Sequence, residues 1–361
     1  MARDFNLFFM ATCAILALFI WLPLRQFGEC CSYDDIIQRQ MSSESLYHSK
    51  FNPTASAYKL AGIRYKKPAV LVIGSFRVMQ FREEFFAKHF YNAGGVASGV
   101  YQLDDFVDRM MLVHRPSVVL IGVDLWWFNP RHPYAAPDFV ATQNAPSKNM
   151  LGKARALFNR VLLPRPARRM GLSSMDNDAG FGMDGSYYYN LSSVNTKDSK
   201  FRDTLDRLKN GGAAFEKSHD YRNENLAVFI KSVNKLKASG IQVILFYPPF
   251  APSVAKVINQ NPEYQYINKV KTALKNQFEV FDYTDPVKFD SNECEFIDGF
   301  HGGDVTYARM LADMAKHNPE IKFILATNIS ATIARYEGRA RISNQYRQKP
   351  EIDFLELGCE R

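Results

Sequence analysis

The stretch AVLVIGSFRV, residues 69–78, decides the fold. Its first five residues are apolar, the run ends at Gly74 and Ser75, and a helix is expected soon after, over residues 78–89. A short run that is apolar at every position is typical of a strand covered on both faces, as in a parallel sheet. A serine at the end of such a strand either caps the next helix or carries chemistry at the edge of the sheet.

Strand-like and helix-like runs alternate along the rest of the chain. Strands are expected over residues 69–74, 90–92, 117–122, 241–247 and 278–282, and helices over residues 78–89, 102–114, 223–239, 264–276 and 304–316. This alternation predicts an α/β fold with a doubly wound, parallel, five-stranded sheet. The active crevice of such a sheet lies beyond the carboxyl ends of its strands, and Ser75 falls there.

Composition supports a large folded core. Of the 361 residues, 47% are hydrophobic and 23% are charged, which excludes an intrinsically disordered chain. Residues 139–175 contain seven Lys or Arg and no Asp or Glu, so this one stretch accounts for most of the net charge of +8. Nucleic acid is not an expected partner, because the sequence contains no recognisable nucleic-acid-binding module.

A long insertion, residues 126–222, interrupts the alternation after the third strand. It contains Gly-, Ser- and Tyr-rich runs such as GFGMDGSYYYN, residues 180–190. An insertion at this edge of the sheet is expected to build a substrate wall or lid. Its basic stretch, residues 151–169, has the pattern of an amphipathic helix, which either contacts anionic lipid headgroups or an acidic polymer, or packs on the domain as a surface helix.

The N-terminal run FNLFFMATCAILALFIWLPL, residues 5–24, carries no charge and is long enough to cross a bilayer as a helix. No small-residue cleavage pattern follows it, so an uncleaved anchor is favoured over a signal peptide. The expected organisation is a transmembrane anchor over residues 1–25, a juxtamembrane linker over 26–67, an α/β domain over 68–320 and a C-terminal helical extension over 321–361.

Four cysteines lie outside the expected anchor: Cys30, Cys31, Cys294 and Cys359. They permit three pairings, and the sequence does not choose among these or free thiols. Because none forms a C-x-x-C pair and adjacent cysteines are poor ligands for one metal ion, no metal site is expected.

The loop FIDGFHGG, residues 296–303, supplies the residues that a reactive serine needs. Acyl transfer by a serine requires a base within hydrogen-bonding reach and a third group that orients the base. Asp298 and His301 follow the fifth strand, so one loop can bring both to the edge where Ser75 lies. The alternative is that His301 binds Asp298 for structural reasons alone and Ser75 is only a helix cap.

These residues, in this order and at these strand ends, resemble the SGNH (GDSL-like) hydrolase superfamily, whose sheet is flavodoxin-like. The chain is most similar to its membrane-anchored branch of cell-envelope acyltransferases, such as those of alginate acetylation and teichoic-acid D-alanylation. Gly74 and Ser75 match the first family block, Gly94 or Gly95 in YNAGG the second, GVDLWWFN the third and DGFH the last. The resemblance covers residues 68–320 apart from the insertion.

The resemblance implies a role for each matching residue. Ser75 would be the nucleophile, His301 the general base and then acid, and Asp298 the group that orients the imidazole. The backbone N–H of Ser75, with that of Gly94 or Gly95, would donate to the oxyanion.

The third block departs from the family pattern, because Asp124 stands where an Asn is expected. An ionised carboxylate cannot donate a hydrogen bond and repels an oxyanion. Three explanations stay open: Asp124 is protonated, Asn92 or Asn129 supplies an amide, or the site has one donor fewer.

Two further residues near these blocks have two interpretations each. Arg77 either binds an acidic group of the substrate or forms an ion pair on the first helix. Trp126 either stacks on a sugar ring or belongs to the core.

The function that the resemblance implies is a serine O-acyltransferase, in the simplest case an acetyltransferase, that modifies a cell-surface or exported polysaccharide. It would be anchored in the inner membrane by a single span, face the periplasm, take its acyl group from a multi-span membrane-bound O-acyltransferase and need no cofactor. Two alternatives stay open: an esterase that removes acyl groups from the same polymer, and a non-catalytic glycan-binding subunit.

Overall fold

The computed structural model describes residues 2–26, 32–48, 55–135, 171–173, 179–189, 196–340 and 355–359. Its central sheet contains β2 (Val70–Gly74), β3 (Phe90–Gly94), β4 (Val118–Gly122), β8 (Gln242–Tyr247) and β9 (Val280–Asp282), in the order β3-β2-β4-β8-β9. All neighbouring strands are parallel. Numbered along the chain, the order is 2-1-3-4-5, as in flavodoxin-like doubly wound sheets. The predicted α/β class and its five parallel strands are confirmed.

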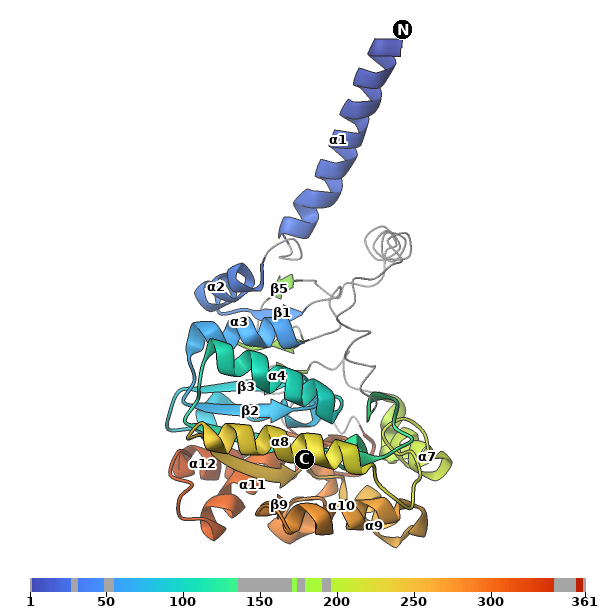
Figure 1. The fold of residues 1–361 in the computed structure, drawn as a ribbon, viewed down its shortest axis with the longest axis vertical. Helices are drawn as coiled ribbons and strands as arrows, with labels where there is room; N and C mark the ends of the chain where they lie inside the picture. Colours follow the sequence, from blue (N-terminus) through green and yellow to red (C-terminus); the bar gives the residue numbers. More distant parts are fainter. Residues whose placement is uncertain are drawn as a thin grey trace.

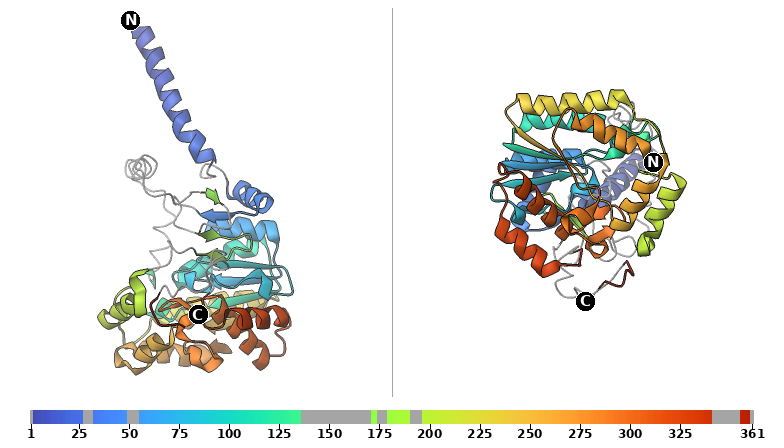
Figure 2. Two further views of the ribbon diagram at one scale, coloured as in Figure 1. Left: turned by 180° about the vertical axis from the view of Figure 1, so that it is seen from behind. Right: turned by 90° about the horizontal axis from the view of Figure 1, so that it is seen from below.

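Helices cover both faces of this sheet (Figures 1 and 2). On one face lie α3 (Ser56–Lys66), α4 (Val100–Val113) and α8 (Asn223–Ala238), and on the other α11 (Asp304–His317) and α12 (Ala326–Tyr336). Leu71 and Ile73 of β2 point into the first core, whereas Val70 and Val72 point into the second. The unbroken apolar run of β2 thus follows from burial on both faces.

The predicted helix over residues 78–89 is wrong. Two 3-10 turns, η1 (Phe76–Val78) and η2 (Glu83–Phe85), take its place. The segment buries side chains in several directions, which a surface helix with one apolar stripe cannot do: Phe81, Arg82, Phe85 and Phe86. The other four predicted helices are present as α4, α8, α10 (Gln265–Lys275) and α11.

The region expected to be a linker, residues 26–67, is part of the folded body where the structure describes it. It forms α2 (Tyr33–Ser43), β1 (Leu46–His48) and α3, and Ile63 of α3 lies in the core. β1 pairs antiparallel with two short strands of the insertion, β5 (Gly171–Ser173) and β6 (Gly180–Phe181), and β6 pairs with β7 (Tyr187–Tyr188). The juxtamembrane segment and the insertion therefore form a second, small sheet together.

The remaining described elements lie around the carboxyl edge of the central sheet and in the second half of the chain. They are η3 (Leu125–Phe128), η4 (Pro133–Ala135), η5 (Thr196–Phe201), α7 (Arg202–Asn210), α9 (Pro252–Gln260), η6 (Pro262–Tyr264), η7 (Pro286–Phe289), η8 (Glu293–Glu295), β10 (Phe296–Asp298) and β11 (His301–Gly302). The basic helix expected over residues 151–169 falls outside the described residues.

Helix α1 (Ala2–Gln26) contains the expected anchor segment and projects from the α/β body in Figure 1. The side chains described along it, residues 5–18, are exposed. Within the described part of the chain, no helix combines the length and the apolar character that crossing a membrane requires.

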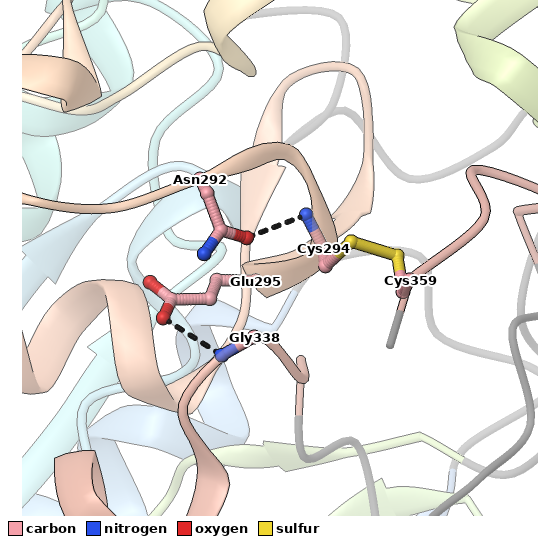
Figure 3. The surroundings of a disulfide bond; sticks show 5 residues. All are labelled: Asn292, Cys294, Glu295, Gly338 and Cys359. Carbon is pink, nitrogen blue, oxygen red and sulfur yellow. Dashed lines mark hydrogen bonds between the residues drawn. A yellow bond between two sulfur atoms is a disulfide. The ribbon is translucent and has the colours of Figure 1, made fainter. Parts of the chain in front are cut away.

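A disulfide joins Cys294 to Cys359 and so ties the C-terminal segment to the loop before β10 (Figure 3). Next to it, Gly338 N donates to Glu295 Oε1 at 3.2 Å. The C-terminal segment is also held by Leu355, which is buried in the core. Of the other cysteines, Cys30 and Cys31 fall outside the described residues.

Candidate active site

The turn that follows β2, residues 74–80, is called the serine turn below. Gly74 has φ +154°, and a Cβ atom there would lie 3.0 Å from Gly122 O, so this position requires glycine. Ser75 then caps η1, because its Oγ accepts a hydrogen bond from Arg77 N at 3.1 Å. Among the described residues, the Ser75 N–H has no hydrogen-bond partner.

The second candidate segment, residues 296–302, is the histidine hairpin formed by β10 and β11. Asp298 Oδ2 lies 2.7 Å from His301 Nδ1, and Oδ1 accepts hydrogen bonds from Phe300 N and His301 N at 2.9 and 2.8 Å. Burial raises the pKa of Asp298, but the imidazole and the two N–H groups outweigh it, so the pKa lies below its ordinary value. Asp298 is therefore an ionised carboxylate that fixes the orientation of the His301 ring.

Arg77 connects the serine turn to the histidine hairpin. Its side chain is 2% exposed, and Nε donates to Phe300 O at 2.9 Å. Nη1 donates to Asp124 Oδ1 at 2.9 Å, and Nη2 donates to the carbonyls of Pro248 and Pro249. One guanidinium thus holds together the carboxyl ends of β2, β4 and β8 and the loop that carries the histidine.

Ser75 and His301 lie on the two segments that Arg77 joins. No hydrogen bond links them directly within the described chain. Both are close enough to Asp124 to lower the pKa of that carboxyl, Ser75 through its hydroxyl and His301 through its charge. The three predicted catalytic residues are thus brought to one edge of the sheet, and hydrogen bonds between such groups commonly tighten only when substrate binds.

Asp124 is fully buried and forms an ion pair with Arg77. Burial raises the pKa of Asp124 above its ordinary value, although Arg77, Ser75 and His301 act in the opposite direction. Because an arginine stays charged in proteins, its contact with Oδ1 favours the carboxylate form. Asp124 is therefore an acceptor in this site, and the explanation in which it is protonated does not fit the ion pair.

The two glycines expected to complete the oxyanion site do not offer a free donor. Gly94 N donates to Asn92 Oδ1 at 2.7 Å, and Gly95 N donates to the carbonyls of Gly74 and Ser75, each at 3.0 Å. The two bonds from Gly95 N fix the serine turn against the end of β3. In the described structure, both glycine N–H groups are therefore already hydrogen-bonded, and neither serves as the expected second donor.

The two amides considered as substitutes are engaged as well. Asn92 Nδ2 donates to Val78 O and Phe81 O at 2.8 and 3.1 Å, and Asn129 Nδ2 donates to Glu216 O. Both side chains therefore stabilise loops. Of the three explanations for Asp124, these contacts agree best with the one in which the site has one donor fewer.

Arg77 and Trp126 have structural roles. All contacts of the Arg77 guanidinium are internal, so the interpretation as a substrate-binding cation is not supported. Trp126 is 6% exposed, and its ring lies 5.1 Å from Arg77 Cζ, with Phe250 at 4.3 Å from the same atom. These aromatic faces enclose the guanidinium, so Trp126 belongs to the core.

Three supporting contacts have no local sequence signal. Arg82 forms a buried, two-pronged ion pair with Asp304 at 3.0 and 2.8 Å, at the start of α11. The Tyr307 hydroxyl donates to Arg77 O. Asp198 of the insertion accepts a hydrogen bond from Gly299 N at 2.9 Å. Tyr307 thus holds the serine turn, Asp198 holds the histidine hairpin, and the Arg82–Asp304 pair joins the segments that follow them.

No family model matches this chain, and no curated protein and no solved structure compared with it matches either. In the described part of the chain, no cluster of three or more His, Cys, Asp or Glu is arranged to hold a metal ion. The chemical interpretation of the site therefore depends on its own geometry.

Proposed function

We propose that this chain is a serine O-acyltransferase of SGNH type, which transfers an acyl group, acetyl in the simplest case, to a polysaccharide. The observation that supports it best is the oriented Asp298–His301 pair, held through Arg77 next to a serine at the carboxyl edge of a parallel sheet. The 2-1-3-4-5 strand order is compatible with the SGNH resemblance.

The proposed reaction has two halves. His301 Nε2 takes the proton of Ser75 Oγ, and Oγ attacks the carbonyl carbon of the donor ester. The oxyanion accepts a hydrogen bond from the Ser75 N–H, and collapse of the intermediate expels the donor alcohol, which takes the proton from His301. His301 then removes the proton of an acceptor hydroxyl, whose oxygen attacks the acyl-serine and forms the new ester. Ser75 leaves as the alcohol and recovers its proton from His301.

The cellular setting is part of the same proposal. α1 would anchor the chain in the inner membrane, with the α/β domain facing the periplasm. The Cys294–Cys359 disulfide agrees with an oxidising compartment. A multi-span membrane-bound O-acyltransferase would supply the acyl donor, and the basic stretch of the insertion would contact lipid headgroups.

The proposal is tested on the full-length chain in detergent. The wild type should be labelled at Ser75 by a fluorophosphonate, and labelling should be lost in Ser75→Ala and greatly slowed in His301→Ala. It should also transfer acetyl from an activated ester to an added oligosaccharide faster than to water. Turnover with water alone would favour the esterase, and neither labelling nor turnover would favour the non-catalytic glycan-binding subunit.

A further inference from the structure

The described part of the C-terminus, residues 355–359, is called the C-terminal strap below. One end is fixed by the disulfide between Cys359 and Cys294, and the other by Leu355, which is buried in the core. Cys294 comes two residues before β10, and the next residue, Glu295, is completely buried. The disulfide therefore fastens the strap at the base of the histidine hairpin (Figure 3).

The strap contacts η5 of the insertion. Leu355 O accepts a hydrogen bond from Lys200 N at 2.7 Å, and Glu356 Oε2 accepts one from Ser199 Oγ at 2.6 Å. Consecutive residues are bonded on both sides, so these contacts fix the position of η5 against the strap. The residue before this pair, Asp198, is completely buried.

Asp198 in turn holds the tip of the histidine hairpin. Its Oδ2 accepts hydrogen bonds from Gly299 N at 2.9 Å and from Thr204 Oγ1 at 2.7 Å. The hairpin packs on the same residue of α7, because a Cβ atom at Gly299 would lie 2.5 Å from Thr204 Cγ2. Gly299 comes directly after Asp298 and two residues before His301. The strap, η5 and Asp198 thus connect the base of the hairpin to its tip.

The backbone where the strap meets η5 has a conformation that needs support. Lys200, Phe201 and Glu356 have φ values of +52°, +55° and +54°, in the left-handed region that residues other than glycine rarely adopt. Such conformations persist where surrounding contacts hold them. Lys200 and Glu356 each take part in one of the two hydrogen bonds between strap and η5, so we expect the segment around Asp198 to relax when the strap is released.

The tip of the hairpin also has contacts that do not depend on the strap. Ala251 N donates to Gly299 O at 3.0 Å, and Arg77 Nε donates to Phe300 O at 2.9 Å. Release of the strap is therefore expected to loosen the hairpin, not to unfold it.

We propose that the C-terminal strap positions the His301 loop through Asp198, and that reduction of the Cys294–Cys359 disulfide releases it and lowers the reactivity of Ser75. A dithiol converts this disulfide into two thiols and is itself oxidised to a disulfide. Both cysteines are partly exposed, so a dithiol can reach the bond. The part of the inference that concerns Ser75 rests on the proposed function, whereas the part that concerns the hairpin does not.

The test compares the full-length wild type in detergent before and after reduction with dithiothreitol, well below its Tm. Amide hydrogen exchange, measured by mass spectrometry, should become faster in residues 196–204 and 296–303 and stay unchanged in β2 and β4. Fluorophosphonate labelling of Ser75 should slow by about 10- to 100-fold, the result expected when a reacting group moves by about 1 Å. Cys359→Ser should show the slow rate without reduction, and dithiothreitol should not change it further. Asp198→Ala should also be slow, with the disulfide intact.

The matched control is Met110→Ala, which opens a cavity in the core near the end of α4, at the amino edge of the sheet. It should lower the Tm without slowing the labelling of Ser75. The proposal is wrong if reduction leaves exchange in residues 296–303 unchanged, if exchange rises while labelling stays fast, or if Met110→Ala slows labelling as much as Cys359→Ser. A wild type that is not labelled at all would contradict the proposed function, and exchange in residues 296–303 would still show whether the strap holds the hairpin.

Discussion

Replacing Asp124 with Asn tests how much the buried ion pair between Asp124 and Arg77 contributes to the stability of the protein. The change removes one negative charge and keeps the shape of the side chain. In the wild type, Asp124 is completely buried and Arg77 is 2% exposed, and the other partners of the guanidinium are neutral carbonyls. The variant therefore leaves a buried cation without a counter-ion, which typically costs about 3–5 kcal/mol.

The lower end of this range is expected, because Asn Oδ1 can still accept the hydrogen bond from Nη1. A loss of about 3 kcal/mol corresponds to a fall in Tm of about 6–12 °C for a domain of this size. Thermal unfolding of the full-length chain, followed by circular dichroism, measures it. Turnover should fall as well, because the histidine hairpin is held by the same guanidinium.

Asp34→Asn is the matched control, since Asp34 pairs with Arg64 at 2.6 Å but both side chains are 54% exposed. An exposed pair contributes about 0–1 kcal/mol, so its Tm should change by no more than about 4 °C. Equal Tm values for the two variants would refute the argument that the buried pair stabilises the site. A faster Asp124→Asn enzyme would show instead that an amide at this position restores an oxyanion donor.

Two further predictions concern the histidine hairpin and the disulfide. Asp298→Asn should lower kcat by about 10³- to 10⁴-fold, because the imidazole loses its oriented, charged partner. In the wild type, the lowered pKa of Asp298 stabilises the fold fully above the unfolded pKa of about 3.9. This stabilisation is lost as the pH falls through the lower pKa of the folded state. In acid titrations, the free energy of unfolding should therefore decline less steeply for the variant than for the wild type. Cys359→Ser opens a loop of 65 residues and should lower the free energy of unfolding by up to about 4 kcal/mol, whereas Cys13→Ser should not.

Strands β2, β3 and β4 could be predicted from the sequence because burial at every position leaves a strong local signal. Each strand of the central sheet begins and ends within two residues of the prediction. Helix α3 left no such signal, since six consecutive positions, residues 58–63, are buried in it, among them Lys59. The Lys59 ammonium donates to Asn92 O and Gly185 O, and no amphipathic pattern predicts those contacts.

The contact between Asp298 and His301 could be predicted for a similar reason, because the two residues are three positions apart in one loop. The network around Arg77 could not, since its partners Asp124 and Phe300 are 47 and 223 residues away in sequence. The same limit explains the wrong helix over residues 78–89. Its shape depends on Arg82 reaching Asp304 on α11, a contact 222 residues away.

Arg77 and Asp124 therefore have to be considered as one buried ion pair. In the proposed reaction, a carboxylate at position 124 gives up one oxyanion donor, which typically costs about 3 kcal/mol in the transition state. In return, Asp124 fixes Arg77, and Arg77 Nε holds the carbonyl of Phe300, the residue before His301. The proposed function needs the His301 ring in one orientation, so we expect loss of the Asp124–Arg77 ion pair to lower turnover even where an amide at position 124 adds a donor.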